Sequence, residues 1–197
     1  MLCFDVDGET TALSEDPALR HRLTTFSQCQ YGPEAGVPRL LGLLEHLSVP
    51  ATFFIPSYVA EHHPQMTQAI IDKGFEIGAH GHLHEKLAGL TLEQEAEILD
   101  ASLEIFREGF GIVPKGQRAP WFEINPWTPD LLLDYGCCFT LTLPPWMSGR
   151  PSRVKLLERM LNDILATGDA WLATGSEIAG WFKANPNARR TIDLDAE

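Results

Sequence analysis

The sequence predicts a barrel-like α/β fold in which parallel strands alternate with helices. Short apolar runs that suit buried strands, such as 2–6 and 75–79, alternate with stretches of helical periodicity, such as 92–106. Candidate functional side chains also follow the ends of apolar runs, as Asp7 follows 2–6. Barrels of parallel strands place their sites at the C-terminal ends of the strands, so this pattern favours a barrel-like arrangement.

The other elements are expected at defined stretches of the chain. Further strands are expected at 49–56, 115–121, 139–143 and 170–173. Helices are expected at 38–47, 57–62, 64–73, 92–109, 128–133, 152–167 and 177–183. Thr91 and Gln94 predict a capping box, and Ser176 predicts the cap of the last helix. The polar, aperiodic stretch 13–30 is expected to be a surface loop.

Composition bounds the class of protein. A chain of 197 residues with 44% hydrophobic and 21% charged residues suits one globular domain, expected at 1–184, followed by a polar tail at 185–197. Lys and Arg number 15 against 27 Asp and Glu, a formal net charge of -12. This balance disfavours nucleic acid and an anionic membrane surface as partners.

The cysteines predict a cytoplasmic protein. Cys3, Cys29, Cys137 and Cys138 show no CxxC spacing, and the last two are adjacent, so we expect reduced thiols. The apolar run at 2–4 is too short for a signal peptide, and no run approaches the ~20 residues of a membrane span.

The strongest chemical pattern is a group of imidazoles after the apolar run 75–79. His80, His82 and His84 fall within five residues, and one turn of helix or a tight loop brings His80 and His84 to the same side. Asp7 can add a carboxylate to this pair. Two histidines and one carboxylate leave a coordination position open, which is typical of a catalytic metal site. The alternatives are a solvated His-rich loop and a polar strand end.

Four ordered motifs extend this pattern along the chain. They are Phe4-Asp5-Val6-Asp7-Gly8-Glu9, Ala51-Thr52-Phe53-Phe54-Ile55-Pro56, His80-Gly81-His82-Leu83-His84-Glu85 and Arg118-Ala119-Pro120-Trp121. With these motifs the chain resembles the polysaccharide deacetylases, carbohydrate esterase family 4. It is most similar to the intracellular branch that includes peptidoglycan-deacetylase-like and cyclic-imidase or allantoinase-like amidohydrolases.

The resemblance implies a role for each matching residue. Asp7, His80 and His84 would hold a divalent metal, with Zn²⁺ favoured. Asp5 would be the general base, and Arg118 would pair with that base and orient it. The family fold implied is an incomplete, distorted (β/α) barrel. The metal would polarise the amide carbonyl while Asp5 takes a proton from water.

Two departures from the family pattern concern catalysis. The family places a His-Pro pair after its late strand, and that His protonates the leaving amine, whereas here Pro144 stands at the His position. Relatives also place a substantial segment where only Cys137 and Cys138 lie between Gly136 and Phe139. The chain therefore looks internally shortened. His82 is expected to be a solvent-facing spacer, although it is the nearby imidazole that could replace the missing acid.

The sequence predicts a metal-dependent hydrolase of non-peptide C–N bonds, with polysaccharide or peptidoglycan N-deacetylation as the favoured activity. One alternative is a cyclic imide or allantoin-type amidohydrolase, and another is a non-catalytic remnant that binds metal or sugar. Substrates would be a small amide or imide or an N-acetylated sugar. Trp121, Trp127 and Trp146 could line the pocket or simply pack in the core. Uncovered strand edges of a shortened barrel predict a homo-oligomer.

Overall fold

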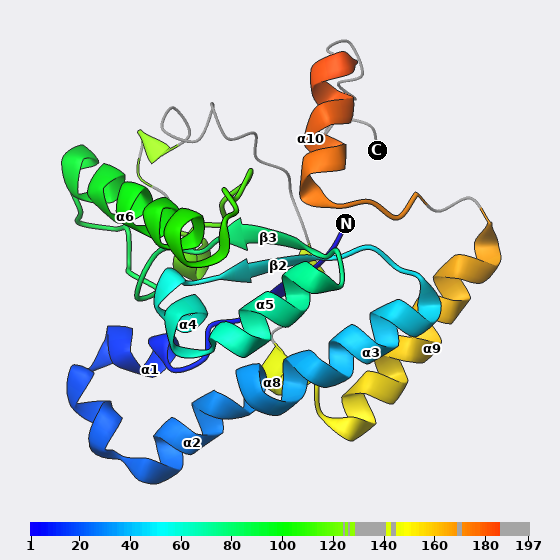
Figure 1. Cartoon of the computed structure of the whole chain (residues 1–197), viewed down its shortest axis with the longest axis horizontal. Helices are drawn as coiled ribbons and strands as arrows, with labels where there is room; N and C mark the ends of the chain where they lie inside the picture. The colour runs from blue at the N-terminus through cyan, green and yellow to red at the C-terminus, as the bar shows by residue number, and fades with distance from the viewer. Residues whose placement is uncertain (124, 126, 129–140, 143–144, 169–170, 186–197) are drawn as a thin grey trace, which may run out of the picture.

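A parallel sheet lies at the centre of the protein (Figure 1). The computed structural model describes residues 1–123, 125, 127–128, 141–142, 145–168 and 171–185. Within these residues the strands have the order β3-β2-β1-β4 and all neighbours are parallel. The strands are β1 (Leu2–Asp5), β2 (Thr52–Ile55), β3 (Glu76–Ala79) and β4 (Leu141–Thr142). An open parallel sheet of this kind is consistent with the expected incomplete barrel.

The sheet separates an apolar face from a face that carries polar groups. Successive side chains of a strand point to opposite faces. Phe4, Phe53 and Ile77 therefore share one face, and all three belong to the main hydrophobic core. The opposite face carries two rows of paired residues. The first row is Cys3, Thr52 and Glu76, and the second row is Asp5, Phe54 and Gly78.

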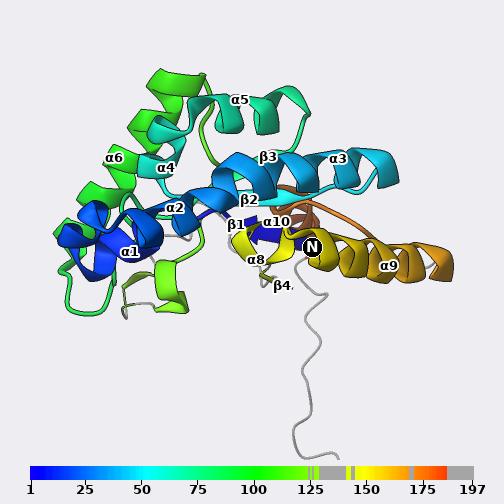
Figure 2. The same cartoon turned by 90° about the horizontal axis from the view of Figure 1, so that it is seen from below.

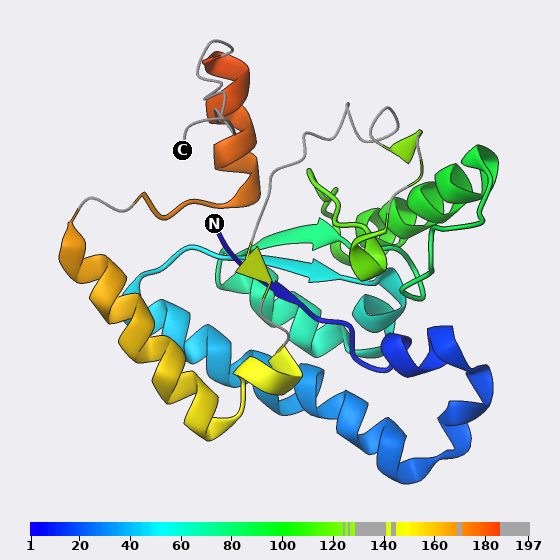
Figure 3. The same ribbon diagram turned by 180° about the vertical axis from the view of Figure 1, so that it is seen from behind.

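Helices cover the apolar face. They are α3 (Val37–Leu47), α4 (Ser57–His62) and α5 (Pro64–Asp72), whose buried side chains join the core cluster. Figure 2 shows α3 between α5 and α9 (Pro151–Thr167). Figure 3 shows the strands in front of α3 and α5, so the polar face of the sheet is turned away from these helices. The functional side chains must therefore gather on the polar face or at the strand ends.

The other helical segments surround this core. They are α1 (Thr10–Glu15), η1 (Pro17–His21), α2 (Leu23–Tyr31), η2 (Gly32–Gly36), α6 (Leu92–Phe110), η3 (Pro120–Phe122), α8 (Pro145–Ser148) and α10 (Gly175–Ala184). The capping box predicted for α6 is confirmed, since Thr91 and Gln94 satisfy each other's backbone N–H groups. Among the described residues, no helix combines the length and apolar character needed to cross a bilayer.

Several expected elements differ from the structure. The stretch 13–30 is largely helical instead of a loop, although α2 buries no side chain completely. Residues 115–121 form no regular strand, and only Gln117 makes a parallel bridge, to Ala79. Residues 171–173 are not a strand either. The cap of α10 is Thr174 instead of Ser176, because Thr174 forms a capping box with Glu177.

Some expectations fall on other parts of the chain. The helix at 129–133, the start of the strand at 139–143, and Pro144, Cys137 and Cys138 lie outside the described residues. The same holds for the tail from residue 186. The division into a domain at 1–184 and a tail at 185–197 therefore stays a prediction.

Close packing at Gly36 predicts a measurable effect on stability. A Cβ at this position would lie 2.5 Å from the backbone oxygen of Pro145 at the start of α8. We expect Gly36→Ala to lower the free energy of unfolding by about 1–3 kcal/mol, because α8 must shift. The control is Gly42→Ala in α3, where a Cβ meets nothing within 4 Å and should stabilise by about 0.5–1 kcal/mol. Urea unfolding of both variants tests this, and equal effects of the two changes would contradict it.

Candidate metal centre

Residues 80–85, called here the histidine loop, begin where β3 ends. Gly81 has φ +70, and a Cβ there would lie 2.6 Å from the Glu85 carboxylate, so the tight turn favours glycine. The same carboxylate accepts hydrogen bonds from the backbone N–H groups of His82 and Leu83, at 3.0 and 2.7 Å. These contacts fix the loop in one conformation, which orients the imidazoles on either side of the turn.

His80 is held in one tautomer by a backbone contact. Its Nδ1 lies 2.7 Å from the carbonyl oxygen of Arg118. A carbonyl only accepts hydrogen bonds, so Nδ1 carries the hydrogen and Nε2 keeps a free lone pair. The imidazole is 2% exposed. This arrangement is typical of metal-binding histidines, whose second ring nitrogen donates to a fixed acceptor.

The two predicted imidazoles and the predicted carboxylate come together. Nε2 of His80 lies 3.4 Å from Oδ1 of Asp7, and Nε2 of His84 lies 3.8 Å from the same oxygen. One donor atom from each of the three residues lies within 4.8 Å of the others. Two ligand atoms bound at about 2.1 Å to a tetrahedral ion are about 3.4 Å apart. The spacing of the cluster therefore suits one metal ion.

Buried polar atoms of the cluster are left without hydrogen-bond partners. Among the described residues, neither Oδ1 of Asp7 nor Nδ1 of His84 has one, and both atoms are inaccessible to solvent. Leaving a buried polar group unpaired costs about 1–3 kcal/mol. A cation between Asp7 and the imidazoles would satisfy Oδ1. The donor set of two imidazoles and a carboxylate also matches the ligands that Zn²⁺ takes in catalytic sites.

The electrostatics of the cluster favour a cation. Burial would raise the pKa of Asp7, but His80, His84 and Arg118 together outweigh burial and hold it below the usual range. Burial would lower the pKa of His80, but Asp7 and Asp5 beside it raise the pKa above the usual value. Burial lowers the pKa of His84 to about 4. At neutral pH, Asp7 is therefore ionised and His84 is neutral, which are the forms that bind metal.

Asp5 and Arg118 form a buried ion pair beside the cluster. Nη1 of Arg118 contacts Oδ1 of Asp5, and the two residues are 4% and 8% exposed. Burial raises the pKa of Asp5, an effect that the neighbouring His80 and Arg118 side chains oppose. The backbone of Arg118 also links it to β3, since its N–H donates to the Ala79 carbonyl at 3.0 Å. One residue thus contacts both the predicted base and a predicted metal ligand.

Of the aromatic candidates, only Trp121 is shown in contact with the metal centre. Its ring lies edge-on to His84, with ring centroids 5.0 Å apart, and its indole N–H donates to the His84 carbonyl at 3.2 Å. Trp121 and His84 both have positive φ, at 59° and 58°. Such strained non-glycine residues often lie at functional sites. Trp127 instead donates to Glu95, and Trp146 lies against Gly32.

Sequence reasoning missed other polar contacts near the cluster. Glu9, which is 3% exposed, pairs with Nε2 of His63 at 2.9 Å. No sequence motif indicated this pair. His82 contacts α4, with Nδ1 2.8 Å from Ser57 Oγ. These pairs join residues 54 and 25 positions apart, so sequence spacing gave no indication of them.

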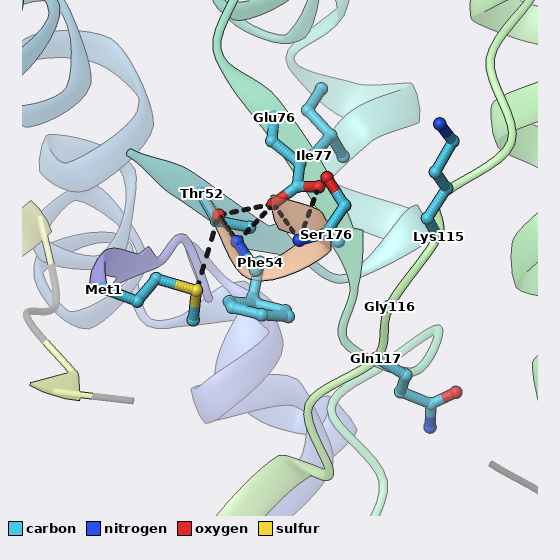
Figure 4. Close-up of a pocket in the computed structure, with 11 residues that line it drawn as sticks. Met1, Thr52, Phe54, Glu76, Ile77, Lys115, Gly116, Gln117 and Ser176 are labelled. Atoms are coloured by element: carbon cyan, nitrogen blue, oxygen red, sulfur yellow. Dashed lines mark hydrogen bonds between the residues drawn. The ribbon is translucent and has the colours of Figure 1, made fainter. Parts of the chain in front are cut away.

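A small pocket lies along the sheet, from the first residues of β2 and β3 to Gly78 and Gln117 (Figure 4). It is lined by Thr52 and Glu76, the first residues of β2 and β3, whereas the predicted ligands follow the strands' C-terminal ends. Glu76 accepts hydrogen bonds from Thr52 Oγ1 and from the N–H groups of Gly175 and Ser176, at 2.6, 2.9 and 3.2 Å. This carboxylate therefore fixes the start of α10 against the sheet. None of the predicted site residues lines this pocket.

Comparison with known proteins identifies the family. The family model for polysaccharide deacetylases matches residues 23–138, more than half of the chain. The chain belongs to the polysaccharide deacetylase family. The match contains His80, His84 and Arg118, whereas Asp5 and Asp7 precede it. The peptidoglycan deacetylase of Helicobacter pylori is 39% identical over 111 residues, which cover 56% of this chain and 38% of that protein. The matched part spans about two fifths of the length of that protein and of a second curated relative, a peptidoglycan deacetylase-like protein of Gibberella zeae.

Solved structures confirm the polysaccharide deacetylase fold. A protein from Mycobacterium smegmatis, described as a candidate polysaccharide deacetylase, superimposes with a TM-score of 0.90 at 31% identity. The match covers 97% of this chain and 92% of that one. The allantoinase PuuE superimposes with a TM-score of 0.75 at 20% identity, over 86% of this chain and 78% of that one, and this likeness concerns the fold alone.

Proposed function

We propose that the protein is a metal-dependent hydrolase that removes acetyl groups from N-acetylated sugars, with peptidoglycan-type glycans as the favoured substrate class. The observation that carries the proposal is the Asp7, His80 and His84 cluster beside the buried Asp5–Arg118 pair. The 39% identity to a peptidoglycan deacetylase supports the substrate class. The proposed cation is divalent, with Zn²⁺ favoured by the donor set.

Each residue of the cluster has a distinct role in this proposal. Asp7, His80 and His84 hold the cation, which polarises an amide carbonyl and acidifies a water molecule when bound. Asp5 accepts the proton of the attacking water as the general base. Arg118 keeps the Asp5 carboxylate in place. Trp121, 37% exposed, provides an aromatic surface beside His84 for a substrate to contact.

Two alternatives remain distinct from this proposal. Hydrolysis of a cyclic imide or allantoin uses the same bond class, and its support is the shared fold of the allantoinase. A non-catalytic remnant that binds metal or sugar is the other alternative, suggested by Pro144 at the expected position of the acid. A cytoplasmic location and a homo-oligomeric state stay predictions from the cysteine pattern and from the shortened barrel.

Acetate release tests the proposal. The protein, loaded with one equivalent of Zn²⁺, is incubated with chitooligosaccharides, with peptidoglycan fragments and with allantoin. We expect acetate from the N-acetylated sugars, loss of turnover when a chelator removes the cation, and recovery when Zn²⁺ is restored. Turnover of allantoin without acetate release would replace the proposal by the imidase alternative. Folded, metal-loaded protein that turns over none of these substrates would support the remnant.

A further inference from the structure

Cys3 occupies an unusual position for a buried cysteine. It is 0% exposed but does not belong to the main hydrophobic cluster, because it lies on the polar face of the sheet. It precedes Asp5 by two residues on β1, so both side chains point to that same face. The sequence alone indicates this shared face, although it does not show what lies opposite the two side chains.

The Arg118 side chain connects these two residues. Nη1 of its guanidinium contacts Asp5 Oδ1, and Nη2 lies 2.8 Å from Cys3 Sγ. The Phe54 ring, on the neighbouring strand β2, lies against the face of the guanidinium, with Cζ 4.1 Å from the ring centroid. Phe54 is the register partner of Asp5, so the three contacts come from adjacent positions of the sheet. The guanidinium is thus held at two edges and one face.

We propose that Cys3 is a positioning residue that fixes the rotation of the Arg118 guanidinium within its plane and thereby the orientation of the base Asp5. The proposal rests on the function proposed above. The Phe54 ring sets the plane of the guanidinium, but stacking on a ring does not fix the rotation of the group within that plane. The Sγ acceptor removes this freedom because Nη1 and Nη2 belong to one rigid planar group.

Arg118 contacts both the proposed base and a proposed metal ligand, through different parts of the residue. Its backbone oxygen accepts the Nδ1–H of His80, while its side chain contacts Asp5. The guanidinium contacts affect Asp5 directly, whereas His80 depends on the backbone, which is fixed separately by Ala79. Loss of the Cys3 contact should therefore disturb the base and leave metal binding intact.

The experiment compares Cys3→Ala, which removes the acceptor, with Cys3→Ser, which keeps a hydroxyl acceptor on the same Cβ. Cys29→Ala in α2 is the matched control, because it makes the same chemical change at a cysteine away from the guanidinium contacts. The first readout is the guanidinium N–H resonances of Arg118 in ¹⁵N-labelled protein, assigned by their absence in Arg118→Lys. The second comprises bound Zn²⁺, kcat and KM for acetate release.

We expect slowly exchanging Arg118 resonances in the wild type, Cys3→Ser and Cys29→Ala, and broadened resonances in Cys3→Ala. We expect kcat of Cys3→Ala to fall about tenfold with KM and bound Zn²⁺ unchanged, and Cys3→Ser to recover most of it. Unchanged Arg118 resonances in Cys3→Ala would overturn the proposal even if the wild type releases no acetate. Equal loss of kcat and metal in Cys3→Ala and Cys3→Ser would overturn it as well, because it would indicate a packing role.

Discussion

Asp5→Asn should lower kcat/KM for acetate release by a factor of about 10²–10⁴ while the protein still binds one metal ion. An amide keeps the shape of the side chain and still accepts a hydrogen bond from Arg118, but it does not take a proton from water. The cation ligands proposed here do not include Asp5. The expected result is therefore loss of turnover without loss of metal.

Asp7→Asn provides the comparison for this variant. Asp7 lies two residues further along the chain, and its Oδ1 faces both imidazoles of the cluster. We expect Asp7→Asn to lose metal and turnover together, because a neutral amide is a weaker ligand than a carboxylate. Steady-state kinetics and elemental analysis of both variants test this separation. Retained turnover in Asp5→Asn would contradict the role of Asp5 as base.

Glu95→Ala should lower the free energy of unfolding by about 3 kcal/mol or more, because several buried donors lose their acceptor. Glu95 is 4% exposed in the first turns of α6. Its carboxylate accepts hydrogen bonds from Asn125 Nδ2, Trp127 Nε1 and Thr128 Oγ1, at 3.0, 2.9 and 2.7 Å. Asn125 also donates to the Leu87 carbonyl at 2.8 Å, which ties the segment after the histidine loop to α6.

Glu97→Ala is the matched control, since Glu97 is exposed on the same helix. We expect this control to change the free energy of unfolding by less than about 0.5 kcal/mol. Urea unfolding monitored by tryptophan fluorescence measures both variants. Similar midpoints for the two would show that the Glu95 contacts contribute little to folding. A large decrease in the free energy of unfolding in Glu95→Ala alone would show that the buried hydrogen bonds of Glu95 stabilise the fold.

The sequence predicted those parts of the fold that depend on local patterns. The capping box of α6 needs only two residues three positions apart, Thr91 and Gln94, and it is present. The buried strands β1 to β3 were predicted because short apolar runs bounded by turn residues are typical of buried strands. The convergence of His80 and His84 was predictable because a tight loop sets their separation. The position of Asp7 beside them was predicted because parallel strands have their C-terminal ends at the same edge of the sheet.

Elements without such patterns were predicted wrongly. The stretch 13–30 lacks an apolar stripe, and α2 within it buries no residue completely, so the periodicity that indicates a helix is missing. At α10, Ser176 and Thr174 are both acceptable caps by residue type, and only Thr174 has a glutamate three positions later. The residues 171–173 are apolar enough for a strand, but no sheet neighbour pairs with them among the described residues.

Contacts between distant residues account for the rest of the site. Asp5 and Arg118 are 113 positions apart, so residue spacing gave no distance between them, and their pairing was expected only from the family motifs. The contact of Cys3 with Arg118 and the Glu95 network had no motif to indicate them. Glu95 is one of the acidic residues in the first turns of α6, a position that suits the helix dipole, so residue type alone did not indicate that it is buried.

The most direct test of the account is the stoichiometry of metal binding. The wild type and a variant with both His80→Ala and His84→Ala are equilibrated with Zn²⁺, freed of unbound metal and analysed for metal content, with circular dichroism to check folding. We expect one equivalent of Zn²⁺ in the wild type and none in the folded variant. No bound metal in the wild type, or equal metal in both proteins, would contradict the assignment of Asp7, His80 and His84 as a metal centre.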